Sequence, residues 1–323
     1  MTLGNPDRPI GGLAVRPPPG VELRPIGRDD LAAAVGLARE ARALPPIDPE
    51  PLRDRFAALL DSADIAPFVA LRDGEPAGQV VLAFRRRLNF ATFEGWLAEL
   101  SVAAGARGMG IGRALLNAAV AEWQLRGAHR LLVDVASGQD ACGALLSAAG
   151  FGEWMIDFRL EPVPPTEAGA QTDVRIRPLA GGDADAVTRL IAEFGPWRSP
   201  VPDRMDAVMR TFTRHLRDVE AGIAGSLVAE VEGKVVGVAT LEWQRPFWDD
   251  RLQAWVPDLV VTEPMRGRGI GRALMDAVLR AAHAAGAAEV RLESGPGRET
   301  AHRLYRSSGF VETGRTWVKR RED

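Results

Sequence analysis

The chain of 323 residues contains a single cysteine, Cys142, so no disulfide can form within it. Nothing in that count indicates an oxidising compartment, and a reducing cytoplasm fits the sequence. No run of about 18 apolar residues occurs, so no transmembrane helix is predicted. Residues 1–20 are rich in proline and glycine and lack the basic start and long apolar run of a signal peptide. We therefore expect a flexible tail there, and a cytoplasmic protein without a membrane partner.

An excess of basic residues is also missing. The chain has 40 Lys and Arg against 43 Asp and Glu, a net charge of −3, whereas nucleic-acid binders usually carry a basic surplus. We expect no nucleic-acid partner. Histidine is scarce too, and the spacing of the four histidines matches no metal site, so we expect no bound metal and surface or cofactor-edge positions for them. They are His129, His215, His283 and His302.

The chain is long enough for two domains of ordinary size, and its sequence repeats. The segment from Arg107 to Leu115 matches the segment from Arg266 to Leu274 in eight of nine positions, at an offset of 159 (266 − 107). The same offset relates residues spread over most of the chain, so whole domains are duplicated. These pairs include Trp96 with Trp255, Leu100 with Leu259, and Gly150-Phe151 with Gly309-Phe310.

A proline-rich segment marks the boundary between the copies. We predict a first domain over 21–161, a linker over 162–173 and a second domain over 174–323. Hydrophobic periodicity and turn residues predict the order β-α-β-β-β-α-β-α-β in each copy. The predicted fold class is α/β, with a twisted mixed sheet flanked by helices in each domain. Expected strands cover 21–25, 68–72, 78–83 and 131–135 in the first copy, and 174–178, 227–231, 235–241 and 290–293 in the second, with last strands ending near Leu160 and Arg320.

A glycine-rich loop stands between a strand and a helix in each copy. Glycines at alternate positions let the backbone turn sharply, and the first turn of the next helix adds unpaired N–H groups, so the loop can hold a pyrophosphate. A plain turn is the alternative reading, but two copies in the same context disfavour it. A dinucleotide fingerprint fails because Arg113 and Arg272 stand where its third glycine belongs, and no Gly-Lys-Ser/Thr of a P-loop follows.

The residues predicted to contact the cofactor share one position: each lies at the end of the preceding strand, in the loop, or in the first turn of the helix. In the first copy they are Val102, Arg107, Gly108, Met109, Gly110, Ile111, Gly112 and Arg113, and in the second Val260, Val261, Thr262, Arg266, Gly267, Arg268, Gly269, Ile270, Gly271 and Arg272.

The motif Arg-x-x-Gly-x-Gly, followed in the second copy by Leu304-Tyr305-x-x-x-Gly309-Phe310, resembles the GCN5-related N-acetyltransferase (GNAT) family over nearly the whole chain. This resemblance implies a sheet whose fourth and fifth strands splay apart around acetyl-CoA. It also implies direct transfer of the acetyl group to an amine, without a covalent enzyme intermediate.

Acyl transfer requires an acid for the departing thiolate, a base for the amine and polarisation of the carbonyl. Tyr305 matches the tyrosine that the family uses as the acid, and the equivalent position of the first copy is Leu146. A backbone N–H near Val261 is the candidate for polarising the carbonyl. Asp258, with Glu99 as its counterpart, is the candidate base, and Glu242 and Glu293 are alternatives. The usual base of the family cannot be transferred, because Trp96 and Trp255 occupy its position.

Acceptor selection in the family falls to variable helices and to the loop between the third and fourth strands. Here these are residues 38–66, residues 193–225 with Trp197 and Arg198, and loops that contain Arg85-Arg86-Arg87 or Trp248-Asp249-Asp250. An acidic aromatic rim in the second loop would suit a cationic amine. We expect an acetyl-CoA-dependent N-acetyltransferase for a small-molecule or peptide amine, active in the second domain, as a monomer or homodimer. The alternative is a non-catalytic acyl-CoA-binding or regulatory protein.

Overall fold

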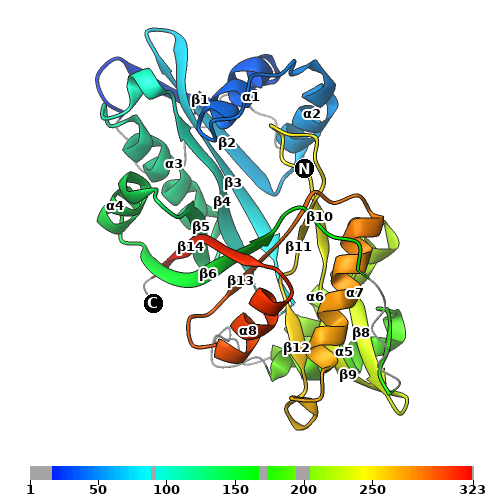
Figure 1. Cartoon of the computed structure of the whole chain (residues 1–323). Helices are drawn as coiled ribbons and strands as arrows, with labels where there is room; N and C mark the ends of the chain where they lie inside the picture. Colours follow the sequence, from blue (N-terminus) through cyan, green and yellow to red (C-terminus); the bar gives the residue numbers. More distant parts are fainter. Residues whose placement is uncertain (1–16, 89–91, 167–172, 194–203, 322–323) are drawn as a thin grey trace.

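The structure, a computed structural model, describes residues 17–88, 92–166, 173–193 and 204–321 (Figure 1). Within these ranges no helix combines the length and the apolar character that crossing a membrane requires. Each copy of the repeat forms strands and helices in the expected mixed order, which confirms the predicted fold class. Two differences stand out: an additional helix follows the first one in each copy, and the third and fourth strands of the second copy are each broken in two.

The elements of the first copy are β1 (Val21–Pro25), α1 (Leu31–Glu40), α2 (Arg53–Asp61), β2 (Ile65–Arg72), β3 (Glu75–Arg86), β4 (Phe93–Val102), α3 (Ile111–Arg126), β5 (Arg130–Ala136), α4 (Asp140–Ala148) and β6 (Gly152–Leu160). Those of the second copy are β7 (Arg175–Pro178), α5 (Ala184–Ala192), α6 (Arg204–Glu220), β8 (Leu227–Val231), β9 (Lys234–Ala239), β10 (Glu242–Gln244), β11 (Gln253–Trp255), β12 (Leu259–Val261), α7 (Ile270–Ala284), β13 (Glu289–Ser294), α8 (Glu299–Ser307) and β14 (Val311–Arg320).

Local sequence explains the hairpins of both copies. Asp73 and Gly74 have φ angles of 53° and 85°, and Glu232 and Gly233 have 48° and 74°. Two successive residues with positive φ form the tight turn whose twist matches that of antiparallel strands. The pairs β2–β3 and β8–β9 therefore form where the sequence predicts them.

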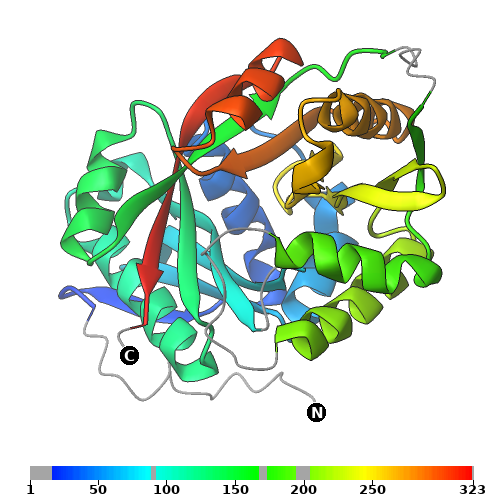
Figure 2. The ribbon, with the colours of Figure 1, turned by 90° about the horizontal axis from the view of Figure 1, so that it is seen from below.

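The two copies exchange their last strands. Strand β6 of the first copy pairs with β13 of the second, and β14 of the second copy pairs with β5 of the first. The exchanged strands also pair with each other, so that they cross the middle of the molecule side by side (Figure 1, Figure 2). Within the described chain the strands form one sheet of ten, ordered β1-β2-β3-β4-β5-β14-β6-β13-β11-β10, and one of four, ordered β12-β9-β8-β7. The predicted division into domains stays a prediction, but the larger sheet runs through its boundary.

This exchange has approximate twofold symmetry. In the antiparallel pair β6–β14, Ile156 lies opposite Arg315, which is its own equivalent at the offset of 159. Two equivalent residues can face each other across antiparallel strands only where a twofold axis passes between them. The molecule is therefore built like a strand-exchanged dimer in one chain.

Arg85 lies close to that axis. Its guanidinium carbon is 4.8 Å from the ring centroid of Trp96 and 4.1 Å from that of Trp255, which are equivalent residues of the two copies. Its Nε donates to Glu94 over 2.7 Å, and its Nη2 is 3.5 Å from Glu293. Stacking on two aromatic faces and pairing with carboxylates stabilise the charge in a half-buried position.

Separate apolar cores lie beneath the helices of each copy. One includes Leu115 and Leu131 of the first copy, and another includes Leu274 and Val290 of the second. The second of these also contains Phe158 from β6, which is 1% exposed. The exchanged strand thus contributes to the core of the copy that receives it.

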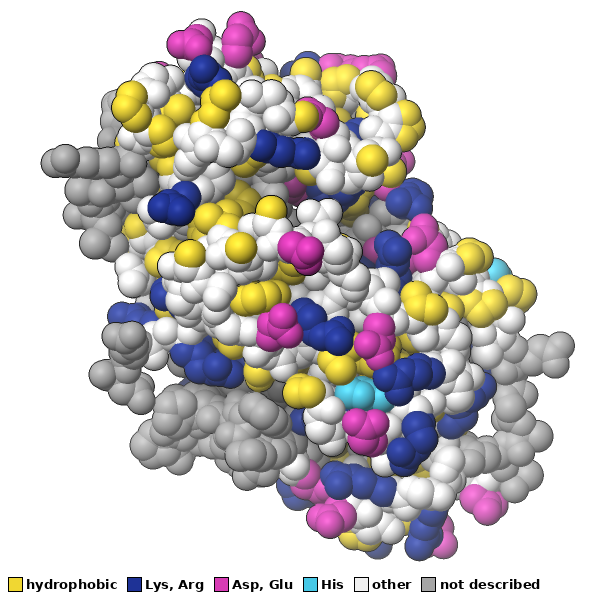
Figure 3. Space-filling model, turned by 60° about the vertical axis from the view of Figure 1, so that its left-hand side comes forward, with side chains coloured by type: hydrophobic (Ala, Val, Ile, Leu, Met, Phe, Trp, Pro, Cys, Tyr) yellow, Lys and Arg dark blue, Asp and Glu magenta, His cyan; other side chains and the backbone are white. Residues whose placement is uncertain are grey.

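On the surface, charges of both signs are mixed. Figure 3 shows Lys and Arg side chains interspersed with Asp and Glu on one face of the molecule, with small apolar areas between them. Among the residues drawn in colour, no broad area of one sign forms on this face.

The strand exchange can be tested with a matched pair of glycine substitutions. A Cβ on Gly314 in β14 would lie 2.1 Å from the Val135 carbonyl oxygen of β5, whereas one on Gly152 in β6 would meet no atom within 4 Å. Because the contact is with backbone, Gly314→Ala should lower the free energy of unfolding by about 3 kcal/mol or more. Gly152→Ala should change it by less than about 0.5 kcal/mol. Urea unfolding of both variants checks this; equal effects would contradict the close approach of β14 to β5.

Candidate functional site

A cleft opens in the second copy where β12 leaves β13. Strand β11 pairs in parallel with β13, but β12 pairs only with β9, in the smaller sheet. The break lies at Val256-Pro257-Asp258, and Pro257 has no N–H with which to continue the ladder. The equivalent strand of the first copy shifts its register at the matching place, between Leu97 and Glu99. The strand is therefore interrupted in the second copy, while β4 of the first copy continues through a bulge at the same place.

The edge of β12 that faces the cleft offers backbone donors. Thr240 donates its N–H to the Asp258 carbonyl, and Thr262 donates to the Val236 carbonyl, so residues 258, 260 and 262 direct their backbone groups toward β9. Because these directions alternate along a strand, Leu259 and Val261 direct theirs into the cleft. The predicted donor Val261 thus has an outward N–H, while Val260 and Thr262 face the neighbouring strand.

The glycine loop continues from this edge into helix α7. Gly267 and Gly269 have φ angles of 78° and 79°, and the first-copy glycines Gly108 and Gly110 have 78° and 82°. These left-handed conformations favour glycine and bring the loop round to the unpaired N–H groups of the helix start. Both loops are therefore shaped as anion-binding sites.

The arginines of the two motifs stabilise their own loops. Arg266 Nε donates to the Val261 carbonyl over 3.0 Å, and Arg107 Nε donates to the Val102 carbonyl over 3.2 Å. Arg272 is paired with Asp276 at 2.8 Å.

The other predicted loop residues divide between the core and the surface. Ile111 and Ile270 are buried in the two cores. Four others lie on or near the surface: Met109, Arg113, Arg268 and Thr262, whose hydroxyl donates to Glu193.

Tyr305 reaches the cleft from helix α8. Its side chain packs 5.4 Å from the ring of Phe158, between ring centroids, and burial raises the pKa of its phenol to about 12. Arg298 and a hydrogen bond with Ser294 oppose that shift, and Glu293 adds to it. The phenol is therefore protonated at neutral pH and can donate a proton at the cleft wall.

The surface or cofactor-edge positions expected for the histidines were wrong for two of them. His302 is 1% exposed and lies 5.3 Å from the Phe158 ring, and His215 is 7% exposed with its Nε2 2.7 Å from the Ser226 hydroxyl. Both occupy interior positions because strand exchange and helix packing cover them. No group of three or more potential metal ligands exists among the described residues.

Three carboxylates lie near the break in the strand, with different partners. Asp258 is 1% exposed, its Oδ2 is 3.3 Å from the Thr240 hydroxyl, and its Oδ1 is buried without a hydrogen-bond partner. Burial raises the pKa of Asp258, and burial also raises the pKa of Glu242 to about 7. Glu293 accepts a hydrogen bond from Trp255 Nε1 at 2.7 Å and lies 3.7 Å from Arg87. Asp258 and Glu242 are thus available for proton transfer, whereas Glu293 is engaged.

The equivalent positions of the first copy are chemically inert. Leu146 replaces Tyr305 and is fully buried, and Val135 replaces Ser294. Glu99, the counterpart of Asp258, forms an ion pair of 2.7 Å with Arg42. The first copy keeps the glycine loop, but at these equivalent positions it has neither the phenol nor a carboxylate without an ion pair.

The loop between β10 and β11 covers that part of the first copy. Phe247 enters a core of the first copy with its ring 5.9 Å from that of Phe56, and Trp248 lies 4.1 Å from the Arg42 guanidinium. Asp249 pairs with Arg251, and Asp250 pairs with Arg55. The loop expected to form an acidic rim for an acceptor instead joins the two copies. Trp197 and Arg198, also expected to select the acceptor, lie outside the described residues.

Residues of the first copy complete the cleft of the second. Arg87 is buried, donates to the Pro257 carbonyl at the strand break, and has a raised pKa because the surrounding carboxylates outweigh its burial. Trp154 and Met155 of β6 line the cleft beside Tyr305. Sequence reasoning assigned Arg87 only to a loop and did not identify Phe158. No sequence signal identified them, because both residues reach the site through contacts with the other copy.

Three cavities that share lining residues surround this site. The cleft itself, of about 50 Å³, shares Arg87 and Pro257 with a cavity of about 30 Å³ beside Asp258. That small cavity shares Arg86, Arg214, Asp218 and Glu242 with a cavity of about 380 Å³ between the two copies. The three cavities are therefore neighbours: Arg87 and Pro257 lie between the cleft and the small cavity, and Asp218 and Glu242 lie between the small cavity and the large one.

Known proteins resemble the chain in sequence and in structure. It is 34% identical to mouse N-acetyltransferase 8 over 126 residues, and 45% identical over 51 residues to an uncharacterised N-acetyltransferase of Bacillus subtilis. These matches cover 38% and 16% of the chain, and they span only 53% and 36% of the relatives' own lengths.

Two solved structures have a similar fold over the whole chain. A GCN5-related N-acetyltransferase from Sphaerobacter thermophilus has a TM-score of 0.66 at 20% identity, covering 94% of this chain and 97% of that one. A tandem GNAT protein from the clavulanic acid biosynthesis pathway has a TM-score of 0.64 at 16% identity, covering 94% and 100%.

The model of the acetyltransferase (GNAT) family matches residues 35–151 and 187–310. Each match contains one glycine loop between a strand and a helix, so the two copies described above are two copies of the family's fold. Because these matches cover most of the chain, the protein belongs to the acetyltransferase (GNAT) family.

Proposed function

We propose that the protein is an acetyl-CoA-dependent N-acetyltransferase whose reaction takes place in the second copy, while the first copy binds acyl-CoA without turnover. The observation that carries this proposal is the asymmetry between equivalent positions. In the second copy Tyr305 lines the cleft and Asp258 lines the small cavity next to it, whereas the first copy has Leu146 and an ion-paired Glu99 at these positions.

Acetyl-CoA, the proposed acetyl donor, can bind both glycine loops through the same features. Left-handed glycines and the start of α7 or α3 supply N–H groups for the pyrophosphate. In the second copy the Val261 N–H lies on the open strand edge, where it can hydrogen-bond the thioester carbonyl and stabilise negative charge that develops on its oxygen.

In the proposed reaction the amine nitrogen forms a bond to the acetyl carbon, and the carbon–sulfur bond of the thioester breaks. The amine loses a proton and the CoA thiolate gains one, so no oxidant or reductant is required. Tyr305 is assigned as the donor of the proton to sulfur, because its phenol remains protonated well above neutral pH.

Asp258 and Glu242 are assigned to proton removal from the amine. Both line the cavity of about 30 Å³, which has room for a bridging water. A carboxylate with a pKa near 7 is ionised often enough to accept a proton and basic enough to do so efficiently. Glu242 meets this condition. The buried Oδ1 of Asp258, which has no hydrogen-bond partner, is the second candidate to accept the proton.

Removing the phenol tests the acid. Tyr305→Phe should lower kcat by about 10²- to 10⁴-fold, the usual contribution of a positioned acid, and leave the affinity for acetyl-CoA nearly unchanged. Steady-state assays of CoA release and calorimetry measure the two quantities. An unchanged kcat would refute the assignment.

The pH profile tests the base. Glu242 must be ionised to accept a proton, so activity should fall as the pH drops through about 7. Glu242→Gln should remove that acidic limb from the profile as well as lowering the rate. Asp258→Asn should lower the rate but retain the limb. Persistence of the limb in Glu242→Gln would show that another group produces it.

Equivalent glycines test the two donor sites. A Cβ on Gly271 would lie 3.6 Å from Leu304, and one on Gly112 would lie 3.5 Å from Val102; both are ordinary contacts in the first turn of the helix that follows each glycine loop. Wild-type protein should bind about two acetyl-CoA molecules in calorimetry. Gly271→Ala should weaken one site by about tenfold and reduce turnover, whereas Gly112→Ala should weaken the other and spare turnover. Loss of turnover in Gly112→Ala alone would place the chemistry in the first copy.

A further inference from the structure

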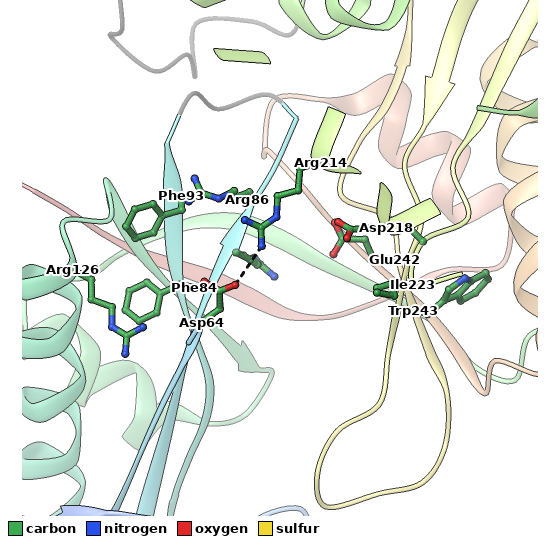
Figure 4. A pocket seen from close by; sticks show the side chains of 12 residues that line it. Asp64, Phe84, Arg86, Phe93, Arg126, Arg214, Asp218, Ile223, Glu242 and Trp243 are labelled. Carbon is green, nitrogen blue, oxygen red and sulfur yellow. Dashed lines mark hydrogen bonds and ion pairs between the residues drawn. The ribbon is translucent and has the colours of Figure 1, made fainter. Parts of the chain in front are cut away.

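The largest of the three cavities, about 380 Å³, lies between the two copies of the fold. Figure 4 shows Asp218 and Glu242 close together on one wall and Phe84, Phe93 and Arg126 on the other, with Arg86, Arg214 and Asp64 between them. Its size suits a small ligand. Because Glu242, one of the two carboxylates assigned to proton removal, lines this cavity, it is the natural place for an acceptor.

Most of the charges around the cavity are already paired. Arg85 binds Glu94 at 2.7 Å, and Arg126 binds Glu122 at 2.7 Å. Arg214 lies 3.4 Å from Asp64 in an exposed pair. These groups shape the cavity, but their charges are largely compensated within the protein.

Three charged side chains are left over. Among the cavity-lining residues that the structure describes, Arg86, Asp218 and Glu242 form no ion pair. Arg86 is held over the Phe93 ring, with 5.2 Å from its guanidinium carbon to the ring centroid. The first copy therefore contributes one cation without an ion pair, and the second copy contributes two carboxylates without an ion pair.

The same cavity has apolar surfaces at both sides. Phe84 and Phe93 contribute them from the first copy, and Ile223 and Trp243 from the second. A small polar ligand would leave these surfaces in contact with water, whereas a ligand with an apolar body would cover them.

The two carboxylates of this cavity lie next to the residues assigned to proton removal. Asp218 and Glu242 also line the small cavity beside Asp258, whose Oδ1 is buried and has no hydrogen-bond partner. An ammonium group that enters between Asp218 and Glu242 therefore approaches the residues assigned to deprotonate it. Arg86 also lines both cavities, so an anionic group on the same ligand can pair with it.

We infer that the acceptor is an amino acid or a close analogue: one small molecule with a primary amine, a carboxylate and an apolar body. Its amine binds between Asp218 and Glu242, its carboxylate binds Arg86, and its apolar part contacts the aromatic walls. This inference rests on the proposed function and specifies the acceptor. The ammonium group loses one proton to Glu242, and the resulting amine forms the bond to the acetyl carbon and loses a second proton as the amide forms. Tyr305 protonates the CoA thiolate that leaves, so one proton is released overall, and the ligand's own carboxylate is unchanged.

Matched ligand pairs test this assignment in the full-length protein. Each pair consists of an amino acid and the amine that lacks only its carboxylate: leucine with isopentylamine, phenylalanine with phenethylamine, and tryptophan with tryptamine. Acetyl transfer and equilibrium binding are measured for wild type, for Arg86→Gln, and for Arg175→Gln as a control. Arg175 is an exposed arginine on β7, the far edge of the smaller sheet.

In wild type we expect at least one amino acid to exceed its paired amine in kcat/KM by about 10- to 100-fold, the range of a charge-assisted arginine–carboxylate contact. Arg86→Gln should reduce that ratio to near one, and Arg175→Gln should preserve it. Amines that equal or surpass the amino acids, or a preference that survives in Arg86→Gln, would overturn the inference and leave the proposed function intact.

Binding separates failure of the inference from failure of the proposed function. If no ligand is acetylated but an amino acid binds at least tenfold tighter than its amine through Arg86, the cavity assignment is supported and the proposed function fails. If neither transfer nor selective binding occurs, the cavity assignment is overturned.

Discussion

The exchange of strands β6 and β14 constrains every other part of the structure. Each strand completes the sheet of the copy to which it does not belong in sequence, and the two meet at the approximate twofold axis beside Ile156 and Arg315. Removing either strand would leave an unpaired sheet edge and expose an apolar core in the opposite copy. The two halves therefore depend on each other for folding as well as for the site.

That dependence extends to the chemistry. Phe158, from the first copy, packs against Tyr305 of the second, and Arg87 binds the Pro257 carbonyl at the break between β11 and β12. The orientation of the proposed acid and the shape of the strand break are thus determined by residues of the other copy. In the reverse direction, Phe247 and Trp248 close the region next to Glu99. The strand-exchanged arrangement therefore leaves the cleft of the second copy open, while Phe247 and Trp248 cover the region next to Glu99 in the first copy.

Sequence reasoning identified the features that depend on local pattern. The offset of 159, the alternation of apolar residues and the glycine loops predicted both copies, their strands and the position of Tyr305. The exchange was missed because β6 and β14 are equivalent strands: the hydrophobic pattern of either one suits either neighbouring strand. The interior position of His302 was missed for the same reason, since the Phe158 that covers it comes from the exchanged strand. Arg87 looked like a loop charge because its partners, the Glu293 carboxylate and the Pro257 carbonyl, are distant in sequence.

Arg85 shows what joining the two copies in one chain permits. It stacks between the equivalent residues Trp96 and Trp255, and its own equivalent is Gln244. A dimer of identical subunits would have to place two arginines near the same axis, where their like charges would repel each other at short range. When one gene encodes both copies, a residue on one side of the axis can change without its equivalent. An arginine can therefore occupy a position near the axis that a symmetric dimer would have to fill twice, and there it joins the two halves. Divergence of the two sites could then proceed without destroying the interface that both require.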